Sequence, residues 1–380
     1  MTLDIRVVER ASSVAAAYCG RLLGMLGADV IKLEPPGGDP MRATHPRVRA
    51  ADGSELSAQF EYLNCYKRSV ALDGPVPGSE VAGLLESADV ILDHVDGDPD
   101  KALAEYRSFS RTNPRLVHVV ISSFGLTGPY RHYRGNDFID FASGGFTFVT
   151  GETHRTPVQG GGPWAGHLVG TTAAIATLAG VRRAAQTGHG QLIDVGAMEA
   201  IAASHQWSIV LYTHQGVIKR RAGNLHAESF NPLGPVPCKD GWVSLGVASL
   251  PQWEGLCLAL DLPELLADER FQTGGDRFDH ADELAAVMDP VLTSLTADEV
   301  VARCEEHHVP AGPVLRVSQA LDEVQLAVRG YWASSSRIGG NARMPERSFR
   351  VPGADAPFRE APAIGEHTRE VLEGLPVPWC

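Results

Sequence analysis

The 380-residue sequence predicts an α/β protein with a doubly wound parallel sheet in a large domain, followed by a smaller α+β domain. Two observations carry this prediction. Short apolar runs alternate with helical stretches through the first half of the chain, which is the pattern of βαβ units. The run over 116–122 is almost entirely apolar, as a strand buried on both faces of a parallel sheet requires.

The elements follow in order from the N-terminus. The first βαβ unit is predicted as a strand over 3–8, a helix over 15–26 that ends at Gly27, and a strand over 30–33. The rest of the large domain is predicted to contain strands over 90–94, 116–122 and 192–195 and helices over 79–86, 102–109, 166–185 and 197–212.

Turn-forming residues crowd the segment over 222–241, and this change in composition marks a linker. We expect a Rossmann-like large domain over 1–221, a linker and small domain over 222–328, and a C-terminal segment over 329–380. Within the small domain, a strand over 242–247 and a helix over 251–260 are expected. Thr296 and Glu299 have the spacing of a capping box that opens a further helix ending at His307.

Charge and cysteine usage limit the functional classes. A net charge of −13 argues against a nucleic-acid partner, which would require a basic face. The six cysteines show no C-x-x-C spacing and are expected to be reduced packing thiols. The N-terminus has an early acidic residue and no long apolar core, so neither a signal peptide nor a membrane span is expected. These features predict a cytoplasmic protein.

Three motif-like stretches are not expected to be sites. Residues 160–165 fit a loose G-x-G-x-x-A pattern, but no convincing strand precedes them, so a dinucleotide site is not expected. Residues 305–308 read Glu-Glu-His-His, yet neighbouring positions on a helix point apart, and no metal site is expected. The sequence also contains no G-x-S-x-G motif of a serine hydrolase.

Three segments are candidates for binding an anion. The loop over 34–39 follows the second predicted strand and is rich in proline and glycine. Lys67 and Arg68 form a basic pair before a strand. The segment over 131–134 carries cations just before a helix that begins near Asn136, whose dipole favours an anion. Each segment can equally be an ordinary surface feature, and Asp137 beside the third can be functional or can cap its helix.

Several segments together resemble a known family. They read, in chain order, LLGMLGADVIKLEPPGGDP, LNCYKRSVALD, ADVILDHV, NPRLVHVVIS, SSFGLTGPYRHYRGNDFIDFASGGF, PVQGGGPWAGHLVGTTAAIATLAGV and TGHGQLIDVGAMEA. This order resembles the family III CoA-transferases, which include formyl-CoA transferase, carnitine CoA-transferase and α-methylacyl-CoA racemase. The resemblance implies acyl-CoA and a small carboxylic acid as ligands and no covalently bound cofactor. It also implies a C-terminal segment that returns to the large domain, and an interlocked dimer with a second identical or paralogous chain.

The chain departs from this family at the catalytic position. The family's transferases use an aspartate that attacks the thioester, and the resemblance places it at Gly166, which has no side chain. His167 beside it could act as a general base or accept an acyl group. The racemase branch uses the histidine of a Gly-His-Asp segment, which reads Gly135-Asn136-Asp137 here. The candidate catalytic positions are therefore Gly166, His167, Asp137 and Asn136.

The CoA contacts implied by the resemblance are partly altered too. Pro35 stands where many relatives have a basic residue, and the family's V-E-N-F segment reads Leu-Asp-His-Val over 92–95. These changes predict weakened CoA affinity. The implied CoA-binding residues are Ala15, Pro35, Lys67, Arg68, His94, Val95, Arg131 and Arg134.

Three hypotheses for function follow. In the first and favoured one, the chain is the nucleophile-less subunit of a CoA-transferase pair and a paralogous subunit supplies the aspartate. In the second, it is an acyl-CoA epimerase, isomerase or dehydratase that uses His167 and Asp137 as acid and base. In the third, it is a CoA-binding protein that has lost catalysis.

Overall fold

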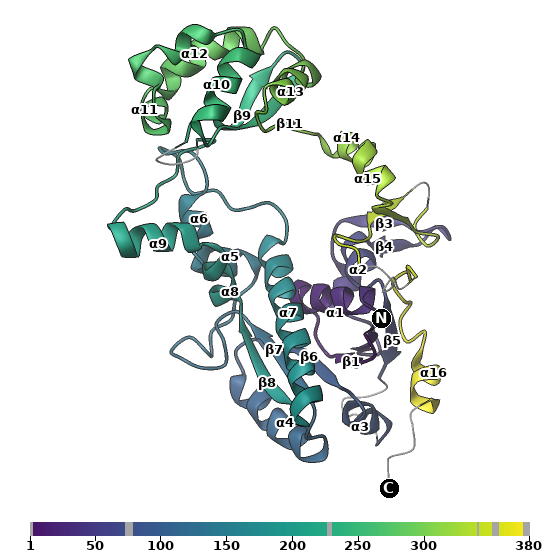
Figure 1. The fold of residues 1–380 in the computed structure, drawn as a ribbon. Helices are drawn as coiled ribbons and strands as arrows, with labels where there is room; N and C mark the ends of the chain where they lie inside the picture. Colours follow the sequence, from purple (N-terminus) through teal and green to yellow (C-terminus); the bar gives the residue numbers. More distant parts are fainter. Residues whose placement is uncertain (1–2, 73–78, 226–229, 340–341, 352–356, 375–380) are drawn as a thin grey trace. The chain divides into compact units, whose positions relative to one another are not determined.

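The structure, a computed structural model, describes residues 3–72, 79–225, 230–339, 342–351 and 357–374 (Figure 1). The chain divides into two compact units. The large unit comprises residues 1–146, 159–206 and 325–380, and the small unit comprises 147–158 and 207–324. The sequence predicted boundaries at 221 and 328. The earlier division falls where the helix expected over 197–212 is in fact two helices, α8 (Ala197–Ser204) and α9 (Gln206–Gln215).

The large unit contains the predicted parallel sheet. Its six strands lie in the order β5-β2-β1-β6-β7-β8, and every neighbouring pair is parallel. Because the strand order proceeds in opposite directions from β1 and from β6, the topological switch point lies between these two strands. The strands are β1 (Arg6–Glu9), β2 (Asp29–Glu34), β5 (Lys67–Ala71), β6 (Val90–His94), β7 (Val117–Ser122) and β8 (Gln191–Gly196).

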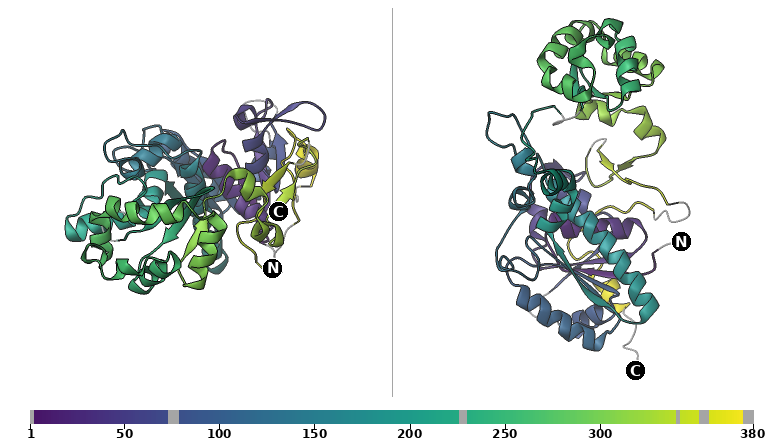
Figure 2. Two further views of the ribbon diagram at one scale, coloured as in Figure 1. Left: turned by 90° about the horizontal axis from the view of Figure 1, so that it is seen from above. Right: turned by 60° about the vertical axis from the view of Figure 1, so that its left-hand side comes forward.

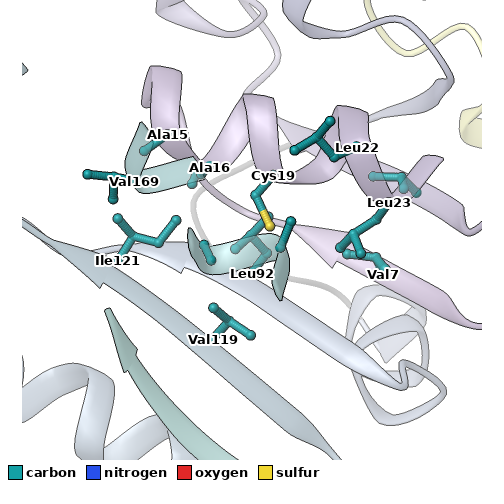
Figure 3. Packing of buried hydrophobic residues seen from close by; sticks show 14 of the residues in the cluster. Val7, Ala15, Ala16, Cys19, Leu22, Leu23, Leu92, Val119, Ile121 and Val169 are labelled. Atoms are coloured by element: carbon teal, nitrogen blue, oxygen red, sulfur yellow. The ribbon is translucent and has the colours of Figure 1, made fainter. Parts of the chain in front are cut away.

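Helices cover both faces of this sheet (Figure 2). Val7 of β1 points toward α1 (Val14–Met25) and α7 (Trp164–Thr187), whereas Val8 points to the opposite face. Figure 3 shows the packing below α1, where its Ala16, Cys19 and Leu23 meet the strand side chains. The opposite face is covered by α3 (Ser79–Glu86), α4 (Pro99–Thr112) and α16 (Thr368–Glu373). These layers confirm the doubly wound α/β class.

The C-terminal segment lies along the β5 edge of the sheet. Tyr66 donates its backbone N–H to the carbonyl of Arg359 at 3.0 Å, and Ala71 donates to the hydroxyl of Thr368 at 3.1 Å. These bonds occupy backbone groups that an edge strand would otherwise expose. The remaining elements of this unit are η1 (Pro40–Ala43), β3 (Arg47–Arg49), β4 (Glu55–Ser57), α2 (Ala58–Leu63), α5 (Asp137–Ser143), β12 (Trp332–Ser334) and β13 (Arg343–Pro345).

The small unit is an antiparallel sheet packed with helices. Its strands are in the order β11-β10-β9, and its core includes Trp253, Phe271 and Leu292. The predicted capping box is present at Thr296 and Glu299, whose side chains each bond the other's backbone N–H. Its elements are β9 (Leu233–Cys238), β10 (Gly241–Gly246), β11 (Ala311–Pro313), α10 (Leu250–Ala259), η2 (Pro263–Leu266), η3 (Glu269–Phe271), α11 (Gly274–Asp279), α12 (Ala281–Leu292), α13 (Ala297–Glu306) and α14 (Val317–Leu321). The short helices α6 (Phe146–Val149) and α15 (Val324–Val328) lie where the chain passes between units.

Helices α1 and α7 approach each other very closely. A Cβ atom added at Gly170 would lie 2.5 Å from the carbonyl oxygen of Ala15, so only glycine fits this position. By length and composition alone, α7 could span a membrane. Its buried residues, among them Val169 and Ala173, instead join the core cluster that contains α1, as in the core helix of a globular domain.

A buried ionic cluster joins the carboxyl ends of β1 and β2 to the start of β5. The Lys67 ammonium donates to Glu9 Oε2 at 2.7 Å, to the Ala17 carbonyl at 2.9 Å and to Asn64 Oδ1 at 2.9 Å. Lys32 lies between the other oxygen of Glu9, at 2.9 Å, and Asp39, at 2.6 Å. Two lysines and two carboxylates thus neutralise one another inside the core.

Substitution Lys67→Met should destabilise the large unit by about 3–5 kcal/mol, because it leaves the buried Glu9 carboxylate without one of its two cations. Thermal unfolding measures the effect, with Lys101→Met, at an exposed position of α4, as the matched control. The double substitution Glu9→Gln/Lys67→Met should recover part of the loss. Equal melting temperatures for the Lys67 and Lys101 variants would contradict a stabilising role for the cluster.

Candidate functional site

A crevice lies at the switch point, outside the carboxyl ends of β1 and β6, where open α/β sheets bind their ligands. Its volume is about 330 Å³. Arg10 follows β1, His94 ends β6, and Lys101 lies in the first turns of α4. Its lining residues are Arg10, Asp93, His94, Val95, Asp96, Asp98, Lys101, Ala102 and Glu105.

The charges of the crevice are only partly balanced. Arg10 donates to Asp93 at 2.9 Å and to Glu105 at 2.6 Å, which neutralises one of the two carboxylates. Burial would lower the Arg10 pKa, but these carboxylates raise it above its usual value. Asp98 accepts from the backbone N–H of Lys101 and caps α4, and Asp96 is exposed. The crevice therefore contains several carboxylates, and these would repel the phosphates of a ligand.

His94 and Val95 line this crevice, as the resemblance implied. The Nδ1 atom of His94 is buried and has no hydrogen-bond partner among the described residues. Burial lowers the His94 pKa, although Asp96 and Asp93 oppose the shift. His94 is therefore a neutral imidazole at pH 7 and adds no positive charge.

Three of the four expected phosphate-binding cations are occupied within the chain. Lys67 lies in the core and all three of its N–H groups are bonded, so it offers none to a phosphate. Arg68 pairs with Asp29 at 2.9 Å and with Glu370 at 3.0 Å. Arg131 pairs with Asp100 at 3.2 Å.

Two cations beside the crevice are free among the residues that the structure describes. One is Arg134, which the resemblance implied; a Cβ atom added at Gly97 would lie 3.4 Å from its Cγ. The other is Lys101, which is among the residues that line the crevice. Sequence analysis missed Lys101 because it resembles any charged residue of a surface helix. Its place in the helix after the switch-point strand is the signal that could have found it.

Pro35 and Ala15 lie apart from these cations. Pro35 is exposed in the loop after β2, and its carbonyl accepts from Gly38 at 2.8 Å. Glu34 fixes the base of this loop by accepting from Arg42 at 2.7 Å and from Asp39 at 2.8 Å. Ala15 is buried in the α1–α7 contact, so its methyl group faces the core.

The position of Gly166 has no room for a side chain. A Cβ atom added there would lie 2.7 Å from Val14 Cγ1 and 3.2 Å from Asp137 Oδ1. Both distances are shorter than ordinary contacts with a carbon atom. Val14 at the start of α1 therefore fills the space in which an aspartate at 166 would begin.

Asp137 holds the first turn of α7. Its Oδ1 accepts from the backbone N–H of Gly166 at 2.6 Å. Burial raises the Asp137 pKa, and the N–H groups of Gly166 and Ala165 oppose the shift. The cap of α5 is Asn136, whose Oδ1 accepts from Phe138 and Ile139, both at 3.1 Å. Of the two roles considered for Asp137, capping its own helix is thus wrong, because the preceding asparagine has that role.

His167 is held in one tautomer. Its Nδ1 lies 2.7 Å from the carbonyl oxygen of Pro163, and a carbonyl can only accept, so Nδ1 carries the proton in the neutral ring. Nε2 is then a proton acceptor. The ring packs edge-on against Tyr18, with centroids 4.7 Å apart, and lies 6.3 Å from the Tyr62 ring. His167 therefore contacts α1 and α2 and does not occupy the place of a side chain at 166.

Asp140 on α5 titrates unusually high for a carboxyl group. Burial raises its pKa to about 6; a hydrogen bond from Ser123 opposes the shift, and the charges of Asp137 and Asp96 add to it. The negative charges of Asp96, Asp137 and Asp140 thus interact near the carboxyl ends of β6 and β7. Within the described residues, no group of three or more His, Cys, Asp or Glu side chains could hold a metal ion.

Comparisons with known proteins agree with this architecture. The model of the family described as CoA-transferase family III matches residues 3–368. A succinate–glutarate CoA-transferase from Agrobacterium fabrum is 31% identical over 98% of this chain and 94% of its own length. The β and α subunits of a succinyl-CoA–L-malate CoA-transferase from Chloroflexus aurantiacus are each 31% identical over 98% of this chain, and over 93% and 88% of their own lengths. The crystal structure of a CAIB/BAIF family protein from Brucella suis superposes with a TM-score of 0.86 at 29% identity, covering 98% of both chains.

The contact between Val14 and residue 166 can be tested by a double-mutant cycle. Gly166→Ala should cost about 1–3 kcal/mol, because the new methyl group overlaps Val14. In Val14→Ala/Gly166→Ala the overlap is removed, so the double variant should be more stable than the sum of the single effects predicts. Chemical denaturation gives the coupling. Strictly additive effects would show that the two positions do not compete for the same space.

Substitution Asp140→Asn should change how stability depends on pH. An unfolded aspartate has a pKa near 3.8, and the folded value is about 6. Between these values the folded state binds more protons, so this group's contribution to stability falls as pH rises through the window. The melting temperature of the native protein relative to the variant should therefore drop from pH 4 to pH 6.5. A difference that stays constant over this range would contradict the raised pKa.

Proposed function

This chain belongs to CoA-transferase family III, and we propose that it is the nucleophile-less subunit of a CoA-transferase pair. A paralogous subunit supplies the aspartate. The observation that carries the proposal is the contact at Gly166, where Val14 fills the space of the missing side chain. A chain that merely lacked one carboxylate would leave a gap there.

The reaction of the pair is a balanced exchange. The partner's carboxylate attacks the acyl-CoA carbonyl, which forms a mixed anhydride and releases CoA thiolate. The thiolate attacks the enzyme's carbonyl carbon, so that the donor carboxylate leaves and an enzyme–CoA thioester remains. The acceptor carboxylate attacks this thioester and again releases the thiolate. Attack of the thiolate on the acceptor's acyl carbon then yields the new acyl-CoA and restores the aspartate.

Two further observations support a pair. Two relatives at 31% identity are the α and β subunits of one succinyl-CoA–L-malate CoA-transferase, so this family includes two-chain enzymes. In the large unit, α7 also exposes large apolar side chains, with Trp164 66% and Ile175 64% exposed. Such residues are typical of surfaces that a second chain covers. The relatives' names also support acyl-CoA and a small carboxylic acid as substrates. We propose that the pair is a dimer and acts in the cytoplasm.

In this proposal the chain's own residues bind and position the substrate. Lys101 and Arg134 are the cations free to contact CoA phosphates, beside His94 and Val95. The carboxylates of the crevice weaken this contact. Asp137 keeps the first turn of α7 in place and does not act on the thioester.

A second candidate is an acyl-CoA epimerase, isomerase or dehydratase. The bond from His167 Nδ1 to Pro163 favours it, because it leaves Nε2 as a base. Such an enzyme would exchange the α-proton of an acyl-CoA with solvent without any partner subunit.

Co-expression with a paralogous chain of the same family that retains the aspartate tests the proposal. The pair should transfer CoA from succinyl-CoA to a dicarboxylate, measured by mass spectrometry of the acyl-CoA products, and this chain alone should not. Replacing the paralogue's aspartate by asparagine should abolish transfer, whereas His167→Ala in this chain should leave most of it. Transfer by this chain alone as a homo-oligomer would contradict the proposal. α-Proton exchange in deuterated water that His167→Ala abolishes would establish the second candidate, and binding without turnover would indicate a binding protein.

A further inference from the structure

A groove in the small unit lies between the strand β9 and the helix α12. Its volume is about 170 Å³, so it suits a ligand smaller than the drug-sized molecules that occupy pockets of roughly 300–1,000 Å³. Along β9 it is lined by the consecutive residues 231–237, together with Asn224 and Leu225. One face of α12 forms the other wall, with Ala281, Leu284, Ala285, Met288 and Asp289. None of these residues lines the switch-point crevice.

β9 is an edge strand, and two of its carbonyl groups point toward its free edge. The register places Pro237 opposite Trp242 and Pro235 opposite Ser244 of β10. The carbonyl of Trp242 accepts from Val314 at 2.9 Å, on the β11 side of β10, so Trp242 and Pro237 are not a hydrogen-bonded pair. Such pairs recur at every second residue, so the same holds for Ser244 and Pro235. Both prolines therefore turn their carbonyls outward, and neither has an N–H to offer beside them.

The groove presents acceptors and a negative charge. Asn231 donates its side-chain amide to the carbonyl of Arg277 at 2.8 Å, which leaves its Oδ1 as an acceptor. Asp289 has no cation partner among the residues that the structure describes. Burial raises the pKa of the Asp289 carboxyl group, because no nearby cation stabilises its charged form. No lysine, arginine or histidine is among the described residues that line the groove.

The rest of the lining is apolar, and this combination selects a ligand class. Val236 and Ala285 are half-buried, while Leu284 and Met288 belong to the core of the small unit. Carbonyl acceptors require N–H or O–H donors, an unpaired carboxylate favours a positive charge, and apolar side chains favour a hydrocarbon chain. A primary ammonium group on an aliphatic chain meets all three requirements.

We propose that the groove between β9 and α12 binds a primary alkylammonium group. Asp289 is its counter-ion, the outward carbonyls of Pro235 and Pro237 accept from its N–H groups, and Val236 and Ala285 contact its aliphatic chain. The inference concerns the small unit and does not depend on the proposed function. Such a group can come from a free polyamine or from a lysine side chain of another protein.

One charge of the small unit opposes this binding. The Arg277 guanidinium donates to the backbone carbonyl of Asn231 at 2.6 Å, although Arg277 does not itself line the groove. Its positive charge repels a bound ammonium group across Asn231. We therefore expect affinity in the millimolar range.

Saturation-transfer NMR of n-butylammonium with the full chain at pH 8, where Asp289 is ionised, tests the proposal. One saturable site per chain is expected. Asp289→Asn should weaken binding about tenfold, because a charge-assisted hydrogen bond is replaced by a neutral one. Asp282→Asn, at an exposed position of the same helix, is the matched control and should bind like the native chain. Tetramethylammonium carries the charge without any N–H and should not bind.

A second variant tests the place of binding without changing any charge. Ala285→Leu adds volume inside the groove and should abolish binding, and its melting temperature shows whether it is folded. Competition with spermidine and with a lysine blocked at both backbone ends identifies the source of the group, and displacement of butylammonium by either supports the proposal. Equal affinity of Asp289→Asn and the native chain, equal binding of tetramethylammonium, or no saturable binding of butylammonium would overturn it.

Discussion

The close contact between α1 and α7 is the constraint on which the candidate site depends. Gly170 lets the helix backbones meet at Ala15, and this contact brings Val14 against Gly166 one turn earlier. Both helices lie on the same face of the sheet, and both begin near the carboxyl ends of its strands. The tautomer of His167, the bond from Asp137 and the closed space at Gly166 all follow from the place where α7 begins.

The buried ionic cluster of Glu9, Lys32, Asp39 and Lys67 is a second constraint on this sheet. Glu9 of β1 receives one lysine from β2 and one from β5, so these three strands are held together by ion pairs. This cluster also explains why Lys67 faces the core, although the sequence suggested that Lys67 and Arg68 bind a phosphate. A basic pair before a strand resembles a phosphate-binding segment, yet strand side chains alternate between faces. Lys67 consequently points into the core, while Arg68 points outward to Asp29 and Glu370.

Periodicity predicted the regular elements well, because buried strands and amphipathic helices repeat their apolar residues at fixed spacings. The strands over 90–94 and 117–122 and the helix over 79–86 lie where the pattern placed them, within one residue. Features that depend on distant segments could not be predicted. The spacing around Asn136 and Asp137 indicates that one of them caps a helix, but not that Asp137 reaches a different helix. The filling of Gly166 by Val14 joins residues more than 150 positions apart, and no local pattern records it.

The closed space at Gly166 restricts the order in which this sequence can change. A mutation that restores a side chain at 166 meets Val14 immediately, so it is costly as long as Val14 is present. Val14 must shrink first, and that step alone creates a small cavity and brings no benefit. The two positions are therefore coupled: a side chain at 166 is tolerated better after residue 14 has become smaller.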